Sequence, residues 1–312
     1  MKVADHSTRP MLGLGLKLTA IAFFAFMSAI IKATSESIPS GEQVFFRSFF
    51  AIPVILIWLG QRRQLRDGLK TANPMGHLWR GVIGTTAMGL GFAGLGLLPL
   101  PETTAIGFAT PIFTVILAAV LLGERIRMFR ISAVALGLVG VIVILSPRLG
   151  NWGGLQDGAS LGVALILVAT AMRSLAQIHI RQLVQTESTA AIVFYFSVFA
   201  AVLGLATLPF GWAMPDAPTL ALLVTAGFLG GMGQICITSA YRFGTPSMLA
   251  PFDYTEILFA VAIGYIWFSE LPTVTMLAGA SLVIVAGILV IWREHRLGLP
   301  RGKARPLMAH KG

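Results

Sequence analysis

Two carboxylates lie inside a long apolar segment of the chain, where charge is costly. Asp253 and Glu256 follow Pro246 by seven and ten residues within the segment 246–268. In a regular helix this spacing places them about 10 and 15 Å from its start, on one face. An ionised group costs roughly 2.5–3.5 kcal/mol at the centre of a membrane helix. The pair therefore predicts proton coupling or contact with a cationic substrate, and a structural ion pair is the alternative.

Arg173 and Gln177 are polar positions one helical turn apart in the apolar segment 161–180. A guanidinium beside an amide suits a carboxylate, a phosphate or the polar edge of a planar ring. A salt bridge from Arg173 to Asp253 or Glu256 is equally consistent with the pattern. Both interpretations stay open.

The remaining polar residues of the apolar segments are weaker candidates. Arg47 lies four residues into the segment 43–59, so it either reaches the outer interface or contacts substrate as a gate residue. Lys17 lies near the inner end of the first segment, where we expect it to reach the interface. Gln234, Tyr241 and Tyr254 are candidates for hydrogen bonds to a solute, and the tyrosine rings for stacking; packing against neighbouring helices is the alternative.

Other chemistry is not indicated. Glu124 and Glu270 each end an apolar segment, and we expect structural roles for them. His179 is interfacial by position, and no second histidine or cysteine stands at ligand spacing, so no metal site is expected. The single cysteine, Cys236, excludes an internal disulfide. We expect no catalytic residue and no cofactor.

Composition places the chain in a membrane. Of its 312 residues, 56% are hydrophobic and 12% charged, with a mean hydropathy of +0.82. Soluble domains carry about 25% charged residues. The net charge of +10 does not indicate nucleic acid, because the basic residues gather at the ends of apolar segments. The expected partners are the lipid bilayer and a small-molecule substrate, and a homodimer is compatible with the sequence.

The apolar segments predict an all-α integral membrane protein with ten transmembrane helices. The spans expected are approximately 12–31, 43–59, 78–98, 104–122, 131–146, 161–180, 190–210, 219–241, 246–268 and 274–292. Pro99 and Pro101 predict a tight turn between the third and fourth spans, and residues 151–158 a linker between the halves. The first segment is too long for a signal peptide and is expected to be retained.

Lysine and arginine counts predict the orientation. With a cytoplasmic N-terminus, 18 of these residues lie inside and two outside. Both termini are therefore expected in the cytoplasm of a multi-pass inner-membrane protein, with residues 293–312 as a basic tail.

The chain also repeats itself. An apolar run that ends at an acidic residue occurs twice, 146 residues apart, and a Gly-x-x-Gly group occurs twice at the same offset. An aromatic segment occurs twice at an offset of 149 residues. The matched stretches are Glu102–Glu124 with Met248–Glu270, Gly81–Gly84 with Gly227–Gly230, and Val44–Ala51 with Val193–Ala200. The pattern predicts two repeats, 12–146 and 159–292. Each contains five spans, an odd number, so the second would be inverted, as in secondary carriers.

These features resemble the EamA-type drug/metabolite transporters. The resemblance rests on Phe45-Phe46-Arg47, on the run from Pro111 to Gly123-Glu124, and on glycines 137, 140, 279 and 287. It covers about residues 12 to 292 and implies a ten-helix inverted-repeat carrier with a substrate cavity lined by both halves. The second copy departs from the pattern, with Ile257 in place of Pro111 and Ser269 in place of Gly123.

The sequence thus predicts a secondary transporter of a small organic metabolite. The family handles amino acids, nucleotide-like metabolites, vitamins and toxic organics, and the chain is similar to a branch that includes riboflavin importers. Riboflavin uptake is the specific hypothesis, and export of another of these solutes is the alternative. An intramembrane enzyme is disfavoured, because neither His-Glu-x-x-His nor Gly-x-Ser-x-Gly is present. A receptor or assembly factor would leave the buried charges unexplained.

Overall fold

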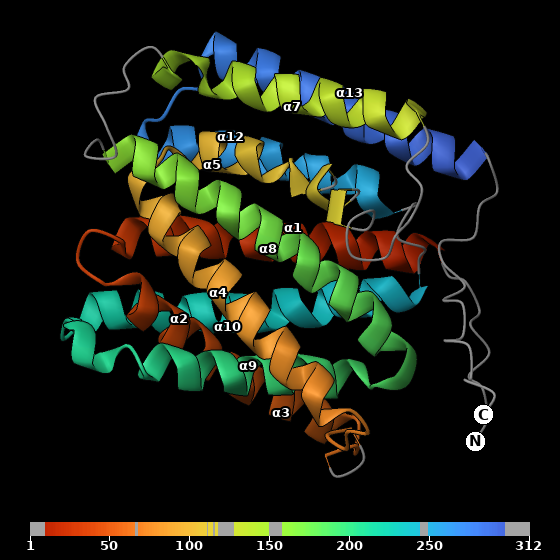
Figure 1. Cartoon of the computed structure of the whole chain (residues 1–312). Coiled ribbons are helices and arrows are strands. Elements are labelled where there is room, and N and C mark those ends of the chain that lie inside the picture. The colour runs from red at the N-terminus through yellow and green to blue at the C-terminus, as the bar shows by residue number, and fades with distance from the viewer. Residues whose placement is uncertain are drawn as a thin grey trace, which may run out of the picture.

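In the computed structural model of the chain, long helices lie side by side in one bundle (Figure 1). The structure describes residues 10–65, 68–110, 112–114, 116–117, 128–149, 158–243 and 249–296, which are helical with no strand. The α-helices are α1 (Pro10–Thr34), α2 (Ser40–Phe49), α3 (Ala51–Gln61), α4 (Pro74–Leu97), α5 (Leu100–Gly107), α7 (Met128–Leu149), α8 (Gly158–Thr186), α9 (Thr189–Leu205), α10 (Ala217–Phe243), α12 (Glu256–Phe268) and α13 (Val274–Arg296). Two short 3₁₀ helices are η1 (Leu208–Phe210) and η2 (Ala250–Thr255).

Four described stretches are long and apolar enough to cross a membrane: 11–34, 40–61, 158–186 and 217–240. Ten crossings stay a prediction, because parts of the chain lie outside the described residues. Among these parts are Glu124, most of the predicted linker 151–158, and the tail beyond residue 296.

The second predicted span is kinked rather than continuous. Its helix is divided at Phe50 into α2 and α3. Pro53 explains the division, because its nitrogen has no hydrogen to donate to the carbonyl of Phe49 and its ring crowds that carbonyl. The two helices still form one apolar stretch long enough for a single crossing.

Two further spans differ from their predicted bounds. The tight turn at Pro99 and Pro101 is confirmed, since α4 ends at Leu97 and α5 begins at Leu100. The ninth span is not regular α-helix throughout, because Ala250–Thr255 forms the 3₁₀ helix η2 and α12 begins only at Glu256. A 3₁₀ turn within a membrane-depth helix often marks a functional position.

The helices are arranged in pairs that join the two halves of the chain. In Figure 1, α7 lies along α13 at one edge, α5 lies near α12 in the next layer, and α1 lies along α10. Helix α2 packs on α9, while α4 packs along α8. Many large apolar side chains remain exposed on the bundle's surface, including Ile57, Val202, Leu258 and Ile266. In a membrane these side chains face lipid.

Equivalent glycines of the repeated Gly-x-x-Gly groups make equivalent contacts. A Cβ atom at Gly81 would lie 2.7 Å from Phe199 Cβ, and one at Gly227 would overlap Phe50. Phe50 and Phe199 are themselves counterparts in the repeated aromatic segment. The contact of α4 with α9 is therefore reproduced by the contact of α10 with α2. Close approach at both places requires a residue without a side chain.

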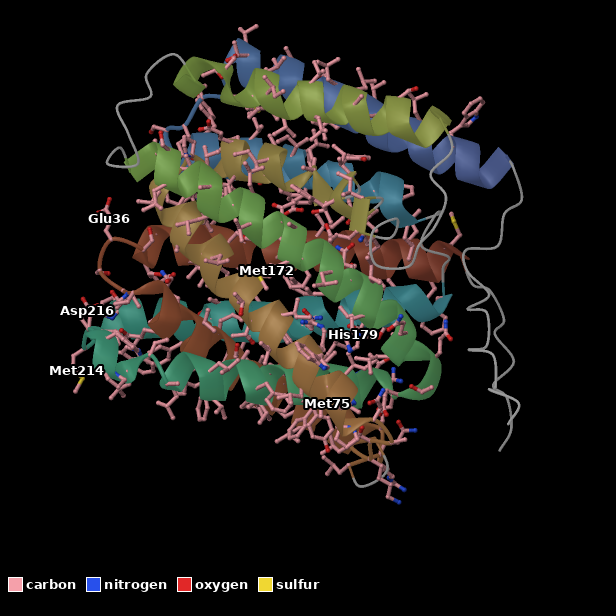
Figure 2. The ribbon with its side chains drawn as sticks, in the orientation of Figure 1. Glu36, Met75, Met172, His179, Met214 and Asp216 are labelled. Carbon is pink, nitrogen blue, oxygen red and sulfur yellow. The ribbon has the colours of Figure 1, made fainter. Side chains whose placement is uncertain are left out.

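Polar clusters tie the helices together at both ends of the bundle. Figure 2 shows Glu36 and Asp216 at one end, with Met75 and His179 toward the other. At the first end, Lys32 Nζ lies 3.0 Å from Glu270 Oε1 and donates to the Leu98 carbonyl at 2.6 Å. Glu270 Oε2 accepts a hydrogen bond from the Leu100 N–H at 2.8 Å. Glu270 therefore has a structural role, as predicted, in joining α1, α5 and α12.

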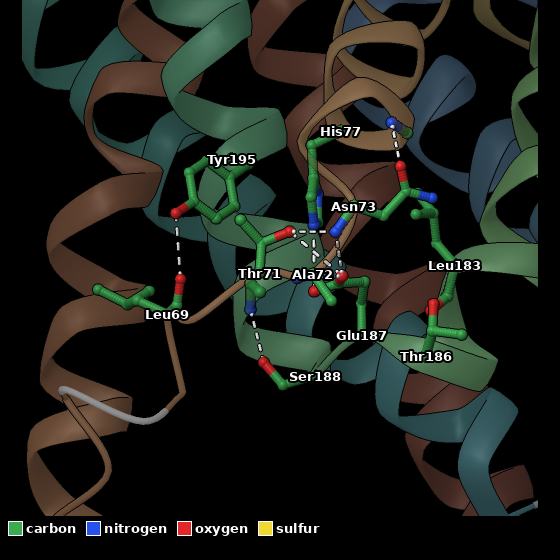
Figure 3. A network of polar contacts seen from close by, with 12 residues as sticks. Leu69, Thr71, Ala72, Asn73, His77, Leu183, Thr186, Glu187, Ser188 and Tyr195 are labelled. Atoms are coloured by element: carbon green, nitrogen blue, oxygen red, sulfur yellow. Dashed lines mark hydrogen bonds and ion pairs between the residues drawn. The ribbon is translucent and has the colours of Figure 1, made fainter.

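At the other end Glu187 organises the connections before α4 and α9 (Figure 3). Its Oε1 accepts from the backbone N–H groups of Ala72 and Asn73 at 2.9 and 3.0 Å and from the Thr71 hydroxyl at 3.2 Å. Its Oε2 lies 3.4 Å from His77 Nε2. Burial alone would raise the pKa of Glu187, but these hydrogen bonds outweigh burial and leave the pKa below its ordinary value.

Candidate solute-binding site

Lys17 and Asp253 form an ion pair between α1 and η2. Lys17 Nζ lies 2.5 Å from Asp253 Oδ1, and the side chains are 3% and 48% exposed, respectively. The prediction that Lys17 reaches the membrane interface is wrong. Asp253 supplies a counter-charge within the bundle, which offsets the cost of burying the ammonium group.

Glu256 and Arg173 extend this pair into a group of four charges. Arg173 and Lys17 both attract the partly buried Glu256 carboxylate electrostatically, while Asp253 repels it. Arg173 forms no ion pair with any carboxylate among the described residues. Lys17, rather than Arg173, makes the ion pair to Asp253, and Arg173 acts on Glu256 from a longer distance. We call Lys17, Arg173, Asp253 and Glu256 the charged cluster.

Arg173 reaches the charged cluster from the middle of α8, where Figure 2 labels its neighbour Met172. Cβ atoms at Gly91 of α4 and Gly107 of α5 would lie 3.7 and 3.9 Å from its guanidinium nitrogens. The guanidinium is thus turned toward α4 and α5, yet its side chain remains exposed. It therefore keeps hydrogen-bond donors for a ligand.

Local backbone geometry positions the two carboxylates. Pro251 has no N–H to donate into a helix, and the backbone around it forms η2 rather than α-helix. Asp253 and Glu256 are three residues apart, and in a 3₁₀ turn residues with this spacing share a face. Glu256 also stands in the first turn of α12, where the helix dipole stabilises a negative charge.

The structure does not bring every predicted residue to the charged cluster. Tyr254 is 8% exposed, packs edge-on against Phe108 with the ring centroids 5.2 Å apart, and lies against Gly287 of α13. It belongs to the apolar core. Gln177 and Gln234 are partly buried on α8 and α10 with no hydrogen bond to the charged cluster. The side chain of Tyr241 lies outside the described residues.

Arg47 is also away from the charged cluster and does not reach the interface. It is 3% exposed and directs Nη2 toward the Gly230 carbonyl at 3.5 Å. Arg80, which the sequence placed among the cytoplasmic charges, is 5% exposed beside it. Asn73 accepts from the Gly76 N–H, and Pro74 opens α4, so Arg80 lies in the second turn of that helix. The Asn73-Pro74 pair is a helix-start signal in the sequence, and it predicts that Arg80 lies within the helix.

His179 lies where α8 meets α4 rather than at an open interface. Figure 2 labels His179, and its Nε2 atom lies 2.9 Å from the Gly76 carbonyl oxygen. This contact connects α8 to the start of α4 and supports a packing role.

Comparison with known proteins shows what this architecture resembles. The profile of the "EamA-like transporter family" matches residues 11–146 and again residues 160–293. An S-adenosylmethionine uptake transporter of Rickettsia felis is 28% identical over 284 residues, which are 91% of this chain and 94% of that protein. The pseudopaline exporter CntI of Pseudomonas aeruginosa is 30% identical over 280 residues, which are 88% and 94% of the two proteins.

A solved crystal structure shows the same fold. It has a TM-score of 0.64 and 18% sequence identity, and the match covers 92% of this chain and 99% of that one. The arrangement of helices described above is therefore an established one.

Proposed function

Since the chain belongs to the EamA-like transporter family, we propose that it is a secondary transporter of a charged, amino-acid-derived metabolite, with uptake of S-adenosylmethionine as the first activity to test. Its relatives support transport of a small metabolite across a membrane as the general function.

The charged cluster is the observation that carries the proposal. A solute that carries both a carboxylate and cationic groups requires positive and negative side chains in one site. Arg173 offers guanidinium donors for a carboxylate, while Asp253 and Glu256 offer acceptors for the N–H groups of an ammonium and negative charge for a sulfonium. S-adenosylmethionine carries all three kinds of group. Riboflavin is an uncharged ring system with no need for four charged side chains, and its uptake is not supported by the relatives.

The same cluster suggests how binding could be coupled to movement. Lys17 belongs to the first half of the chain and Asp253 to the second, so their ion pair joins the two halves. A cationic group of the solute would compete with Lys17 for Asp253. Weakening this pair would loosen one contact between halves that we propose to be inverted repeats of five spans, with both termini cytoplasmic.

Export is the second candidate function. It is favoured by the similarity to the pseudopaline exporter. A carrier moves its solute down whichever gradient applies, so direction must be measured. A homodimer remains compatible with this mechanism, which requires only one chain.

Transport into vesicles tests the proposal. Proteoliposomes containing the full chain should accumulate radiolabelled S-adenosylmethionine in a saturable manner, with unlabelled riboflavin failing to compete. Asp253→Asn and Glu256→Gln should each reduce the rate at least tenfold. Arg62→Gln, which changes an exposed arginine stacked on Trp58, serves as the matched control. Competition by riboflavin but not by amino-acid derivatives would refute the proposed solute class.

A further inference from the structure

Two arginines lie buried together, outside the charged cluster, with no counter-charge from the residues that the structure describes. Arg47 of α2 and Arg80 of α4 are 3% and 5% exposed. Each guanidinium carbon lies near the ring of Phe196 on α9, at 5.7 and 3.9 Å from its centroid. The two cations are close enough to repel each other electrostatically. Like charges are thus held together in the interior of the bundle.

Neither guanidinium has its hydrogen-bonding capacity filled by the described residues. The Nε and Nη1 atoms of both Arg47 and Arg80 are buried and lack a partner there. Asp253, Glu270 and Glu187 pair with other cations, Lys17, Lys32 and His77, respectively. Contact with the Phe196 ring offsets only part of the cost of removing these cations from water, because an unpaired buried charge costs more than a cation–π contact returns.

Small residues hold the two guanidinium groups in place. Arg80 lies against Gly84 of its own helix, and Arg47 lies against Gly230 of α10, where a Cβ atom would be 2.7 Å from Nε. Gly84 and Gly230 are counterparts in the repeated Gly-x-x-Gly groups. Each repeat therefore contributes one glycine position that accommodates a buried arginine.

We propose that Arg47 and Arg80 form an anion-binding site between α2, α4, α9 and α10, which takes chloride or a carboxylate group. Two guanidinium groups supply a fork of N–H donors suited to a small anion, and the anion would neutralise their repulsion. The site is separate from the charged cluster. Met27, which also contacts the Gly230 position, is ten residues from Lys17, about 15 Å along α1. The inference does not depend on the solute proposed above.

Thermal unfolding of the purified full chain in detergent tests this site. Sodium chloride and sodium acetate are each titrated against sodium HEPES, whose bulky sulfonate keeps the ionic strength constant. The wild-type Tm should rise in a saturable manner, by roughly 2–4 °C at ten times Kd. Equal responses to both salts would identify an inorganic anion as a sufficient ligand. A response to acetate alone would identify a carboxylate as the ligand.

Substitution should remove this response. Arg80→Gln should lose the rise in Tm, and without chloride or acetate it should unfold no earlier than the wild type, because an uncompensated buried charge has been removed. A purely structural arginine would instead give a lower Tm under both conditions. Arg62→Gln should retain the wild-type response.

A second measurement does not depend on the variants. Crystals grown with bromide should show an anomalous peak beside Phe196 between the two guanidinium groups. The proposal is overturned if the wild-type Tm responds to neither anion, if Arg80→Gln keeps the response, or if the bromide peak is absent.

Discussion

The ion pair between Lys17 and Asp253 yields a prediction in which the loss of stability depends on which partner is removed. Lys17 is 3% exposed and Asp253 is 48% exposed. Asp253→Asn removes the carboxylate that faces a fully buried ammonium group, whereas Lys17→Met leaves a carboxylate whose side chain is half exposed. Removing one partner of a buried pair costs about 3–5 kcal/mol. Because the Asp253 side chain is half exposed and Glu256 also attracts Lys17, we expect the free energy of unfolding to fall by about 2–3 kcal/mol for Asp253→Asn and by less than about 1 kcal/mol for Lys17→Met.

The double variant makes the test sharper. Lys17→Met with Asp253→Asn removes both charges and should be more stable than Asp253→Asn alone, with a coupling of about 1–2 kcal/mol in the cycle. Unfolding is followed by tryptophan fluorescence as the detergent micelle is titrated with dodecyl sulfate. All three variants should lose transport, so stability and activity would separate in Lys17→Met. Two results would refute a stabilising ion pair between Lys17 and Asp253. One is that the two substitutions change the free energy of unfolding additively, and the other is that Lys17→Met lowers it more than Asp253→Asn does.

Two further predictions concern other parts of the bundle. The pKa of Glu187 is lowered in the folded chain. The ionised side chain therefore stabilises the fold fully above the ordinary carboxyl pKa, about 4.3. This stabilisation is lost as the pH falls through the lower pKa that Glu187 has in the folded chain. Glu187→Gln should therefore lower the free energy of unfolding by about 1–3 kcal/mol near neutral pH. When Tm is measured against pH, the Tm values of the wild type and the variant should converge in acid. A difference in Tm that is the same at every pH would contradict this prediction. Gly227→Ala should lower the free energy of unfolding by about 1–3 kcal/mol, because the alanine methyl group would overlap Phe50. Gly15→Ala should leave the free energy of unfolding unchanged or raise it slightly, because no atom lies within 4 Å of the added methyl group. Equal melting temperatures for these two glycine variants would refute the close contact.

Much of the architecture could be predicted because it depends on local sequence. A segment in lipid must satisfy its own backbone hydrogen bonds, so a long apolar stretch becomes a helix. This is why the apolar segments, the turn at Pro99 and Pro101 and the family were correctly identified. Asp253 and Glu256 were found for the same reason, since a charge in an apolar segment stands out without any knowledge of its neighbours.

The partners of those charges could not be predicted, because pairing depends on the distance between segments remote in sequence. Lys17 and Asp253 are 236 residues apart, and only the packing of α1 against η2 brings them together. The burial of Arg47 and Arg80 in one place could not be predicted from the sequence, since an arginine near a helix end reaches water in one tertiary context and the interior in another. The sequence by itself determined that this chain forms apolar helices in two related halves. Tertiary structure decided which charges face one another, because in a low-dielectric interior the energy of a charge is set by its nearest neighbours in space.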